Sequence, residues 1–249
     1  MSRPKIIAHR GGRHWAPENT LLAFHRSLEF GVDGIELDVQ RCATGELIVF
    51  HDEDLGRTTN GVGLIKDCTF DELRRLNAGS WFDPLLNTVK VPLLSEVLEL
   101  IAGKITLNIE LKNTPVEYPG IIDELLELLV DYPNPGSLII SSFDHKLMKQ
   151  FHEQAPQYKI ALLAAAVFVD LKATATAIGA EYFHPAYDCF RPDVADEAHR
   201  AGLKVNVWTC NSQREWRDCL RMGVQGIITD DPEGLKAFLE RTTAPATTA

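Results

Sequence analysis

The sequence predicts an α/β fold, a single closed (β/α)8 barrel of the TIM type. Short apolar runs, many of them β-branched, alternate with longer segments of helical periodicity, and eight such pairs can be placed along the 249 residues. A hydrophobic content of 45% is ample for a core. An open doubly wound sheet is the alternative fold, but such sheets usually have fewer strands.

The eight strands and their helices follow one another along the chain. The first strand is KIIAH (5–9), and the helix after it can be capped by Asn19 or Thr20. The second strand is GIELDVQ (34–40), and ELIVFH (46–51) pairs with it or extends it. The other strands are expected at 105–112, 137–141, 159–163, 180–184, 204–209 and 226–229. The later helices are expected near 69–76, 94–101, 118–130, 144–154, 168–178, 192–201, 212–222 and 232–240.

One stretch, 52–93, breaks this rhythm. We expect it to be an insertion in the barrel with little regular structure beyond its short helix, because it carries the turn signals Asn60-Gly61, Ala78-Gly79 and Asp83-Pro84. The barrel domain is then expected to span 1–241. The last eight residues, TTAPATTA (242–249), have the composition of a disordered tail.

Composition argues against several classes of protein. The net charge is −10 and the pI about 5.3, which disfavours a nucleic-acid partner. Five cysteines without a CxxC pair disfavour a disulfide framework and a thiolate zinc site, and free thiols suit the reducing cytoplasm. The N-terminal MSRPKIIAHRGG has no apolar core of a signal peptide, and no run is long enough to span a membrane. Nothing in the sequence indicates an oligomeric state.

Acidic residues stand where an interior strand would be apolar. Glu36 and Asp38 lie two apart on one face of their strand, roughly 7 Å from each other, and Glu110 is on the next barrel strand. A lone glutamate on a strand usually faces water. Three converging carboxylates, however, repel and need a cation. Oxygen ligands suit Mg²⁺ or Ca²⁺, and Mn²⁺ is compatible with them.

Two histidines and two cations complete the set at the carboxyl ends of the strands, where active sites of such barrels lie. His9 and His51 each follow an apolar run, which favours acid–base chemistry over a structural role. Arg10 and Lys112 can neutralise part of the acidic charge. Trp208 packs in the core or on the carbon skeleton of a substrate. The remaining histidines are expected to be structural or on the surface: His14, His25, His145, His152, His184 and His199. There is no GxSxG, GxxxxGK[ST] or HExxH motif.

Taken together, these motifs resemble the glycerophosphodiester phosphodiesterase family from residue 6 to about 234. The motifs that carry the resemblance are AHRGG (8–12), APENT (16–20), IELDV (35–39), FHD with LGRTTNG (50–61), LNIELK (107–112), VWT (207–209) and GIITDDP (226–232). One departure is WTCN, in which Cys210 replaces an aliphatic residue of the family pattern.

The resemblance implies a role for each residue. His9 and His51 match the general acid and base, and Arg10 and Lys112 match the cations that contact phosphate. Trp208 matches an aromatic residue near the glycerol end. The metal ligands of the family correspond to Glu36, Asp38 and Glu110.

The implied reaction is metal-dependent hydrolysis of a glycerophosphodiester, such as glycerophosphocholine or glycerophosphoethanolamine, to sn-glycerol 3-phosphate and an alcohol. Either water or the glycerol 2-hydroxyl attacks phosphorus. Alternatives are a phospholipase of the same fold that acts on lysophospholipids or phosphoinositides, and a non-catalytic binding module. A metal-dependent sugar-phosphate isomerase or aldolase barrel shares the acidic cluster but does not predict His9-Arg10-Gly11-Gly12.

Overall fold

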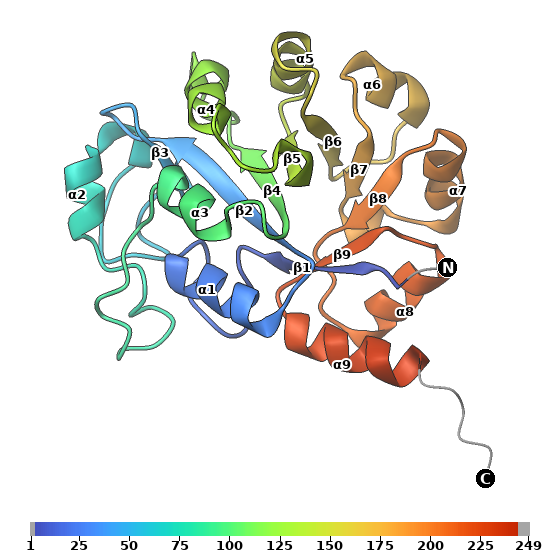
Figure 1. The fold of residues 1–249 in the computed structure, drawn as a ribbon, viewed down its shortest axis with the longest axis horizontal. Coiled ribbons are helices and arrows are strands. Elements are labelled where there is room, and N and C mark those ends of the chain that lie inside the picture. The colour runs from blue at the N-terminus through green and yellow to red at the C-terminus, as the bar shows by residue number, and fades with distance from the viewer. Residues whose placement is uncertain (1–2, 244–249) are drawn as a thin grey trace.

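The computed structural model describes residues 3–243, and Figure 1 shows a barrel of strands surrounded by helices. Eight parallel strands pair in the order β1-β9-β8-β7-β6-β5-β4-β2, and pairing of β2 with β1 closes the sheet. The barrel strands are β1 (Lys5–His9), β2 (Gly34–Arg41), β4 (Thr106–Leu111), β5 (Leu138–Ser142), β6 (Lys159–Ala164), β7 (Tyr182–Pro185), β8 (Lys204–Val207) and β9 (Gly226–Thr229). The predicted (β/α)8 barrel is therefore confirmed.

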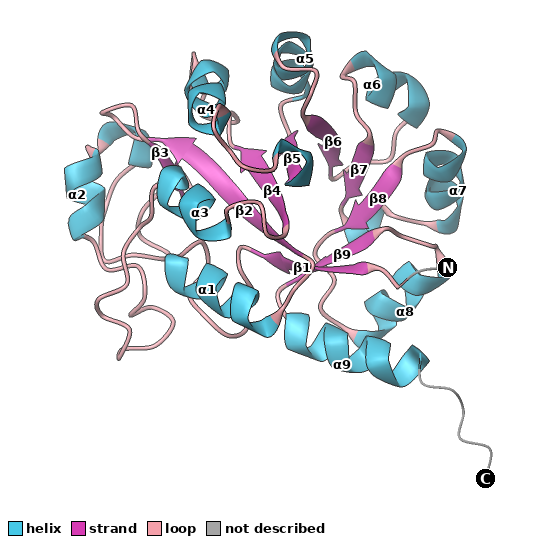
Figure 2. Ribbon diagram, in the orientation of Figure 1, coloured by secondary structure: helices cyan, strands magenta, loops and turns pink. Residues whose placement is uncertain are grey.

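The helices form the outer ring of the barrel (Figure 2). The first begins after Thr20, whose side chain accepts a hydrogen bond from the N–H of Ala23, and it ends at Gly31 in the left-handed conformation. The ring helices are α1 (Leu21–Phe30), α3 (Leu94–Ile101), α4 (Ile121–Leu129), α5 (His145–Gln154), α6 (Leu171–Ala177), α7 (Pro192–Arg200), α8 (Gln213–Arg221) and α9 (Pro232–Thr243). The last helix thus extends two residues into the predicted tail, whose remainder, 244–249, lies outside the described residues.

One predicted strand has a different role from the other eight. Strand β3 (Leu47–Val49) pairs with β2 as expected, but it is antiparallel to β2 and is not part of the closed barrel. It returns the chain from the end of β2 towards the barrel, where the N–H of Phe50 donates to the carbonyl oxygen of Asp38 at 3.0 Å. His51 is placed beside the carboxyl end of β2 in this way.

The insertion contains the two short helical segments η1 (Ile65–Asp67) and α2 (Phe70–Arg75), of which only α2 was expected. The second begins with a reciprocal capping box between Thr69 and Glu72. The insertion packs on β3 and the residues beside it through a small shared apolar cluster: Cys42, Ile48, Phe50, Leu55, Ile65, Leu73, Ala78 and Val91.

The main core fills the space between the outer face of the strands and the helices. A smaller buried cluster joins Ile139 of β5, Ala161 of β6 and Tyr182 of β7. All five cysteines are free thiols. None of the helices within residues 3–243 combines the length and the apolar character that crossing a bilayer requires.

Candidate active site

Three carboxylates meet at the carboxyl end of the barrel. Glu36 and Asp38 share the inner face of β2, and the register of β2 with β4 pairs Asp38 directly with Glu110. One oxygen from each residue can be chosen so that all three lie within 4.8 Å of one another. The three residues are only 4%, 1% and 8% exposed. Since buried carboxylates this close repel strongly, the donor set fits a hard divalent cation such as Mg²⁺ or Ca²⁺.

Two cations reach the same cluster. The ammonium of Lys112 is 2.9 Å from Asp38 Oδ1 and 2.5 Å from Glu110 Oε1, and Nε of Arg10 is 3.3 Å from Asp38 Oδ2. Burial would raise the pKa of Asp38, but Lys112 and Arg10 outweigh it and hold that pKa well below its usual range. Burial and the charges of Asp38 and Glu110 raise the pKa of Glu36. The positive charges of Lys112 and Arg10 therefore do not neutralise all three carboxylates.

Backbone conformation aims two polar groups at these carboxylates. Arg10 has a positive φ of 50°, and its N–H donates to Glu36 Oε2 at 3.1 Å. Asn19 also has a positive φ, of 55°, and its side-chain amide donates to Asp38 Oδ2 at 2.8 Å. Such conformations are uncommon for residues other than glycine, and they recur at functional sites.

Each of the two predicted catalytic histidines is backed by an aspartate. Nδ1 of His9 lies 2.6 Å from Asp230 Oδ1, and Nδ1 of His51 lies 2.5 Å from Asp52 Oδ1. These contacts leave Nε2 of each ring for other partners, and Nε2 of His9 is 3.9 Å from Glu36 Oε2. Burial lowers the pKa of both histidines, and nearby aspartates offset part of this shift. The lowered pKa favours the neutral form of each ring. Both rings line the same cavity as Glu36.

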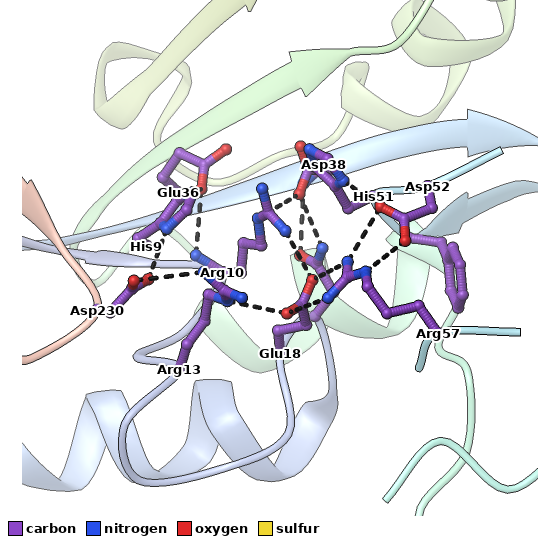
Figure 3. Close-up of polar contacts among 12 residues, drawn as sticks. His9, Arg10, Arg13, Glu18, Glu36, Asp38, His51, Asp52, Arg57 and Asp230 are labelled. Carbon is purple, nitrogen blue, oxygen red and sulfur yellow. Dashed lines mark hydrogen bonds and ion pairs between the residues drawn. The ribbon is translucent and has the colours of Figure 1, made fainter. Parts of the chain in front are cut away.

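A second layer of charge lies behind the cations, and Figure 3 shows it around Glu18. The buried carboxylate of Glu18 accepts hydrogen bonds from Arg10 at 2.7 Å, from Arg13 at 2.9 Å and from Arg57 at 2.7 and 3.0 Å. Arg57 also forms an ion pair with Asp52, the aspartate behind His51. We call Glu18, Arg10, Arg13 and Arg57 the Glu18 hub.

Sequence reasoning assigned no role to Glu18, Asp52, Arg57 or Asp230. All four stand inside motifs that were recognised, namely APENT, FHD, LGRTTNG and GIITDDP. Their position in these motifs was a signal that they serve the site.

The cavity that these residues line also has an apolar wall. The wall includes Leu163, Ile228 and the rings of Phe143 and Trp208. These two rings pack edge to face, with their centroids 5.7 Å apart. The indole N–H of Trp208 donates to the carbonyl oxygen of His184 at 2.8 Å. His184, which was expected to be structural or on the surface, is buried and lines this cavity.

Comparison with known proteins agrees with this geometry. The sequence profile that describes the glycerophosphoryl diester phosphodiesterase family matches residues 9–234. The chain belongs to this family. It is 41% identical to a glycerophosphodiester phosphodiesterase of Caldanaerobacter subterraneus, over 92% of this chain and 95% of the relative. A similar enzyme of Bacillus altitudinis is 39% identical, over 92% of this chain and 95% of the relative.

Solved structures show the same similarity. A phosphodiesterase of Oleispira antarctica, determined in complex with the product sn-glycerol-3-phosphate, superimposes with a TM-score of 0.88 at 28% identity, over 95% of this chain and 97% of that one. The glycerophosphodiester phosphodiesterase of Thermotoga maritima superimposes with a TM-score of 0.78 at 27% identity, over 97% of this chain and 99% of that one. The chain is accordingly an enzyme of the phosphodiesterase class.

Proposed function

We propose that this phosphodiesterase hydrolyses glycerophosphodiesters, such as glycerophosphocholine and glycerophosphoethanolamine, to sn-glycerol 3-phosphate and an alcohol, and that it needs a divalent cation. One observation carries the proposal: two aspartate-backed histidines line the same cavity as Glu36 and Glu110, two members of a buried cluster of three carboxylates. Figure 3 shows His9 beside Glu36 and His51 beside Asp38. This arrangement supports acid–base chemistry next to a bound dication.

The charge on the phosphodiester determines the role of the cations. Attack on phosphorus places additional negative charge on the oxygens around it, and prearranged positive groups stabilise that charge. In this proposal Glu36, Asp38 and Glu110 hold Mg²⁺ or Ca²⁺, with Mn²⁺ also compatible, and the ion supplies positive charge for the phosphate oxygens. Arg10 and Lys112 line the same cavity and contact the same oxygens from the protein side.

The two histidines move the protons. Each aspartate accepts a hydrogen bond from Nδ1–H, which keeps the ring proton on Nδ1 and leaves Nε2 of the neutral ring as an acceptor. One histidine removes the proton of the attacking oxygen, which belongs to water or to the glycerol 2-hydroxyl. The other, in its protonated form, donates a proton to the leaving alcohol.

The test measures sn-glycerol 3-phosphate released from glycerophosphocholine, with EDTA and then with added Mg²⁺, Mn²⁺ or Ca²⁺. We expect EDTA to abolish turnover and one of the ions to restore it. Glu36→Ala should lose metal affinity, whereas His9→Ala and His51→Ala should bind metal normally and lose turnover. His25→Ala is the matched control, because His25 is exposed on α1. Turnover that is indifferent to EDTA, or wild-type rates in both catalytic histidine variants, would contradict the proposal.

A lysophospholipid is a second candidate substrate. Phe143 on the loop after β5 is 40% exposed, and Val167 on the loop after β6 is 46% exposed. These loops follow the carboxyl ends of strands, so the exposed apolar side chains lie on the side of the barrel that carries the site. Turnover of lysophosphatidylcholine in the same assay tests this candidate, and its absence removes it.

We also propose that residues 1–241 form one domain and that the protein works in the reducing cytoplasm. The insertion shares its apolar cluster with Ile48 of β3, which supports a single unit, and one cooperative urea transition is expected. The thiols of Cys210 and Cys219 lie 3.7 Å apart without a bond, which fits a reducing compartment. Two separate unfolding transitions, or recovery of the native protein outside the cytoplasmic fraction, would contradict these two statements.

A further inference from the structure

The floor of the catalytic cavity carries polar groups that the proposed reaction does not use. Asn108 on β4, His184 on β7 and Asn206 on β8 are all buried, and Asn108 and His184 line the cavity. Each of the three has a side-chain atom without a hydrogen-bond partner among the residues that the structure describes: Asn108 Oδ1, His184 Nδ1 and Asn206 Oδ1. A buried polar group without a partner is unfavourable, so a ligand is expected to satisfy those that face the cavity.

The neighbours of His184 determine which of its nitrogens carries the proton. As the Asn206 amide is placed, its Nδ2 lies 2.9 Å from Nε2 of His184. An amide nitrogen only donates, so Nε2 accepts. Burial lowers the pKa of His184 to about 3, and the ring is neutral near pH 7. Its single proton is therefore on Nδ1, which makes Nδ1–H a buried donor without an acceptor.

Asn108 presents the complementary group. Its Nδ2 donates to the hydroxyl of Ser141 at 3.2 Å, which leaves Oδ1 as an acceptor without a donor. Two residues that line the cavity thus carry one unpartnered donor and one unpartnered acceptor, both buried. A hydroxyl group satisfies both, because its oxygen accepts one hydrogen bond and its proton is donated in another.

The depth of this pair decides which hydroxyl it suits. Asn108 stands two residues before Glu110 on the same face of β4, so it lies roughly 7 Å further into the barrel than that carboxylate. The apolar side chains of Leu163 and Ile228 line the same cavity and suit a short carbon chain. A head group that leaves as the alcohol needs the open side of the cavity, whereas the three-carbon glycerol unit can extend inward.

We propose that Asn108 and His184 form a hydroxyl subsite that binds the terminal hydroxyl of the glycerol moiety. The inference rests on the proposed function and names the part of the substrate that the enzyme selects. The hydroxyl accepts from His184 Nδ1–H and donates to Asn108 Oδ1. A substrate that lacks it leaves both groups unpaired in a buried site, and such losses typically reduce the specificity constant steeply.

The test compares two substrates of the wild-type enzyme. One is glycerophosphocholine, and the other is its analogue built on propane-1,2-diol, which keeps the 2-hydroxyl and lacks only the terminal one. We expect kcat/KM to be about 10- to 100-fold lower for the analogue. Equal values for the two substrates would overturn the subsite and leave the proposed function intact. Failure to hydrolyse glycerophosphocholine at all would instead overturn the proposed function.

Variants of His184 test whether this residue causes the difference in kcat/KM between the two substrates. His184→Leu should lower kcat/KM for glycerophosphocholine more than for the analogue and so reduce the discrimination, while His184→Gln, which keeps an N–H donor, should restore part of it. Tyr182→Phe is the matched control, because Tyr182 is two residues earlier on β7 and does not line the cavity. Discrimination that is unchanged in His184→Leu would overturn the assignment.

Product binding gives a readout independent of turnover and of any variant. Calorimetry should show that sn-glycerol 3-phosphate binds wild-type protein about 10- to 100-fold more tightly than propane-1,2-diol 1-phosphate does. Equal affinities would mean that an ordered water, rather than the substrate, satisfies Asn108 and His184, and would overturn the proposal.

Discussion

The carboxylate at the centre of the Glu18 hub can be removed with a nearly isosteric change, Glu18→Gln. Its side chain is only 2% exposed and is paired with three guanidinium groups, those of Arg10, Arg13 and Arg57. Glutamine keeps the shape and one acceptor oxygen but removes the charge. The three arginines then lose the carboxylate that they share and keep only their separate partners Asp38, Asp230 and Asp52, so we expect the variant to be less stable than the wild type.

The magnitude follows from the pKa of Glu18. Burial would raise it, but hydrogen bonds from Arg57 and Arg10 and the nearby positive charges outweigh burial and lower it from 4.5 to about 2. That difference corresponds to about 3.4 kcal/mol of stability at pH 7. Because the pKa is depressed in the folded state, this stability is present above about pH 4.5 and is lost as pH falls towards 2. By linkage, about 1.4 kcal/mol remains at pH 3.

Urea denaturation of wild type and Glu18→Gln at several pH values measures this directly. We expect a difference in the free energy of unfolding of about 3 kcal/mol at pH 7 that shrinks to about 1.4 kcal/mol at pH 3. Contributions of carboxylates that do not contact the hub arginines are common to both proteins and cancel. Glu29→Gln on α1 is the control, because Glu29 is not part of the hub. A difference that does not change with pH would refute the reasoning, since it would show that shape rather than charge matters.

Three further predictions concern activity on glycerophosphocholine. Asp230→Asn should lower kcat by about 100-fold or more with little change in KM, because an amide can donate to Nδ1 of His9 and move the ring proton to Nε2. Steady-state kinetics measure this effect, and an unchanged kcat would contradict the argument that Asp230 fixes the tautomer of His9. Lys112→Met should lower kcat/KM by about 100- to 1000-fold, because the negative charge on the phosphate oxygens loses the ammonium group that stabilises it. A wild-type value of kcat/KM would show that Lys112 does not act on the substrate. Arg57→Leu and Glu18→Gln should affect kcat/KM non-additively, with a coupling energy of at least about 0.5 kcal/mol; additive losses in a double-mutant cycle would show that the two act separately.

The barrel and the acidic cluster could be predicted from the sequence because both depend on local patterns. Alternation along a strand puts Glu36 and Asp38 on one face, and parallel pairing brings the next strand alongside at the same level. The end of β1 is then fixed against β2, with His9 opposite Glu36. No long-range information beyond the fold class is needed for these placements.

Other features depend on contacts that a linear pattern does not contain. The direction of β3 is set by the turn after β2, and only the antiparallel pairing brings His51 beside Asp38. The environment of His184 depends on Asn206, which is 22 residues away on the neighbouring strand. The sequence showed His184 at the end of a strand, as it showed His9, but it could not show that a buried amide would fix its tautomer.

The charges around the site form a continuous series, and this explains why so many of them can be buried together. Asp38 contacts Arg10, Arg10 contacts Glu18, Glu18 contacts Arg57, and Arg57 contacts Asp52, which holds His51. Sign alternates along the series up to the histidine, so the buried carboxylates Asp38 and Glu18 each have partners of opposite sign, as burial requires, and the series then reaches the surface at Arg57. The series begins at a predicted metal ligand and ends at a predicted catalytic histidine. The insertion, which supplies Arg57 and Asp52, is therefore part of the structure that positions His51.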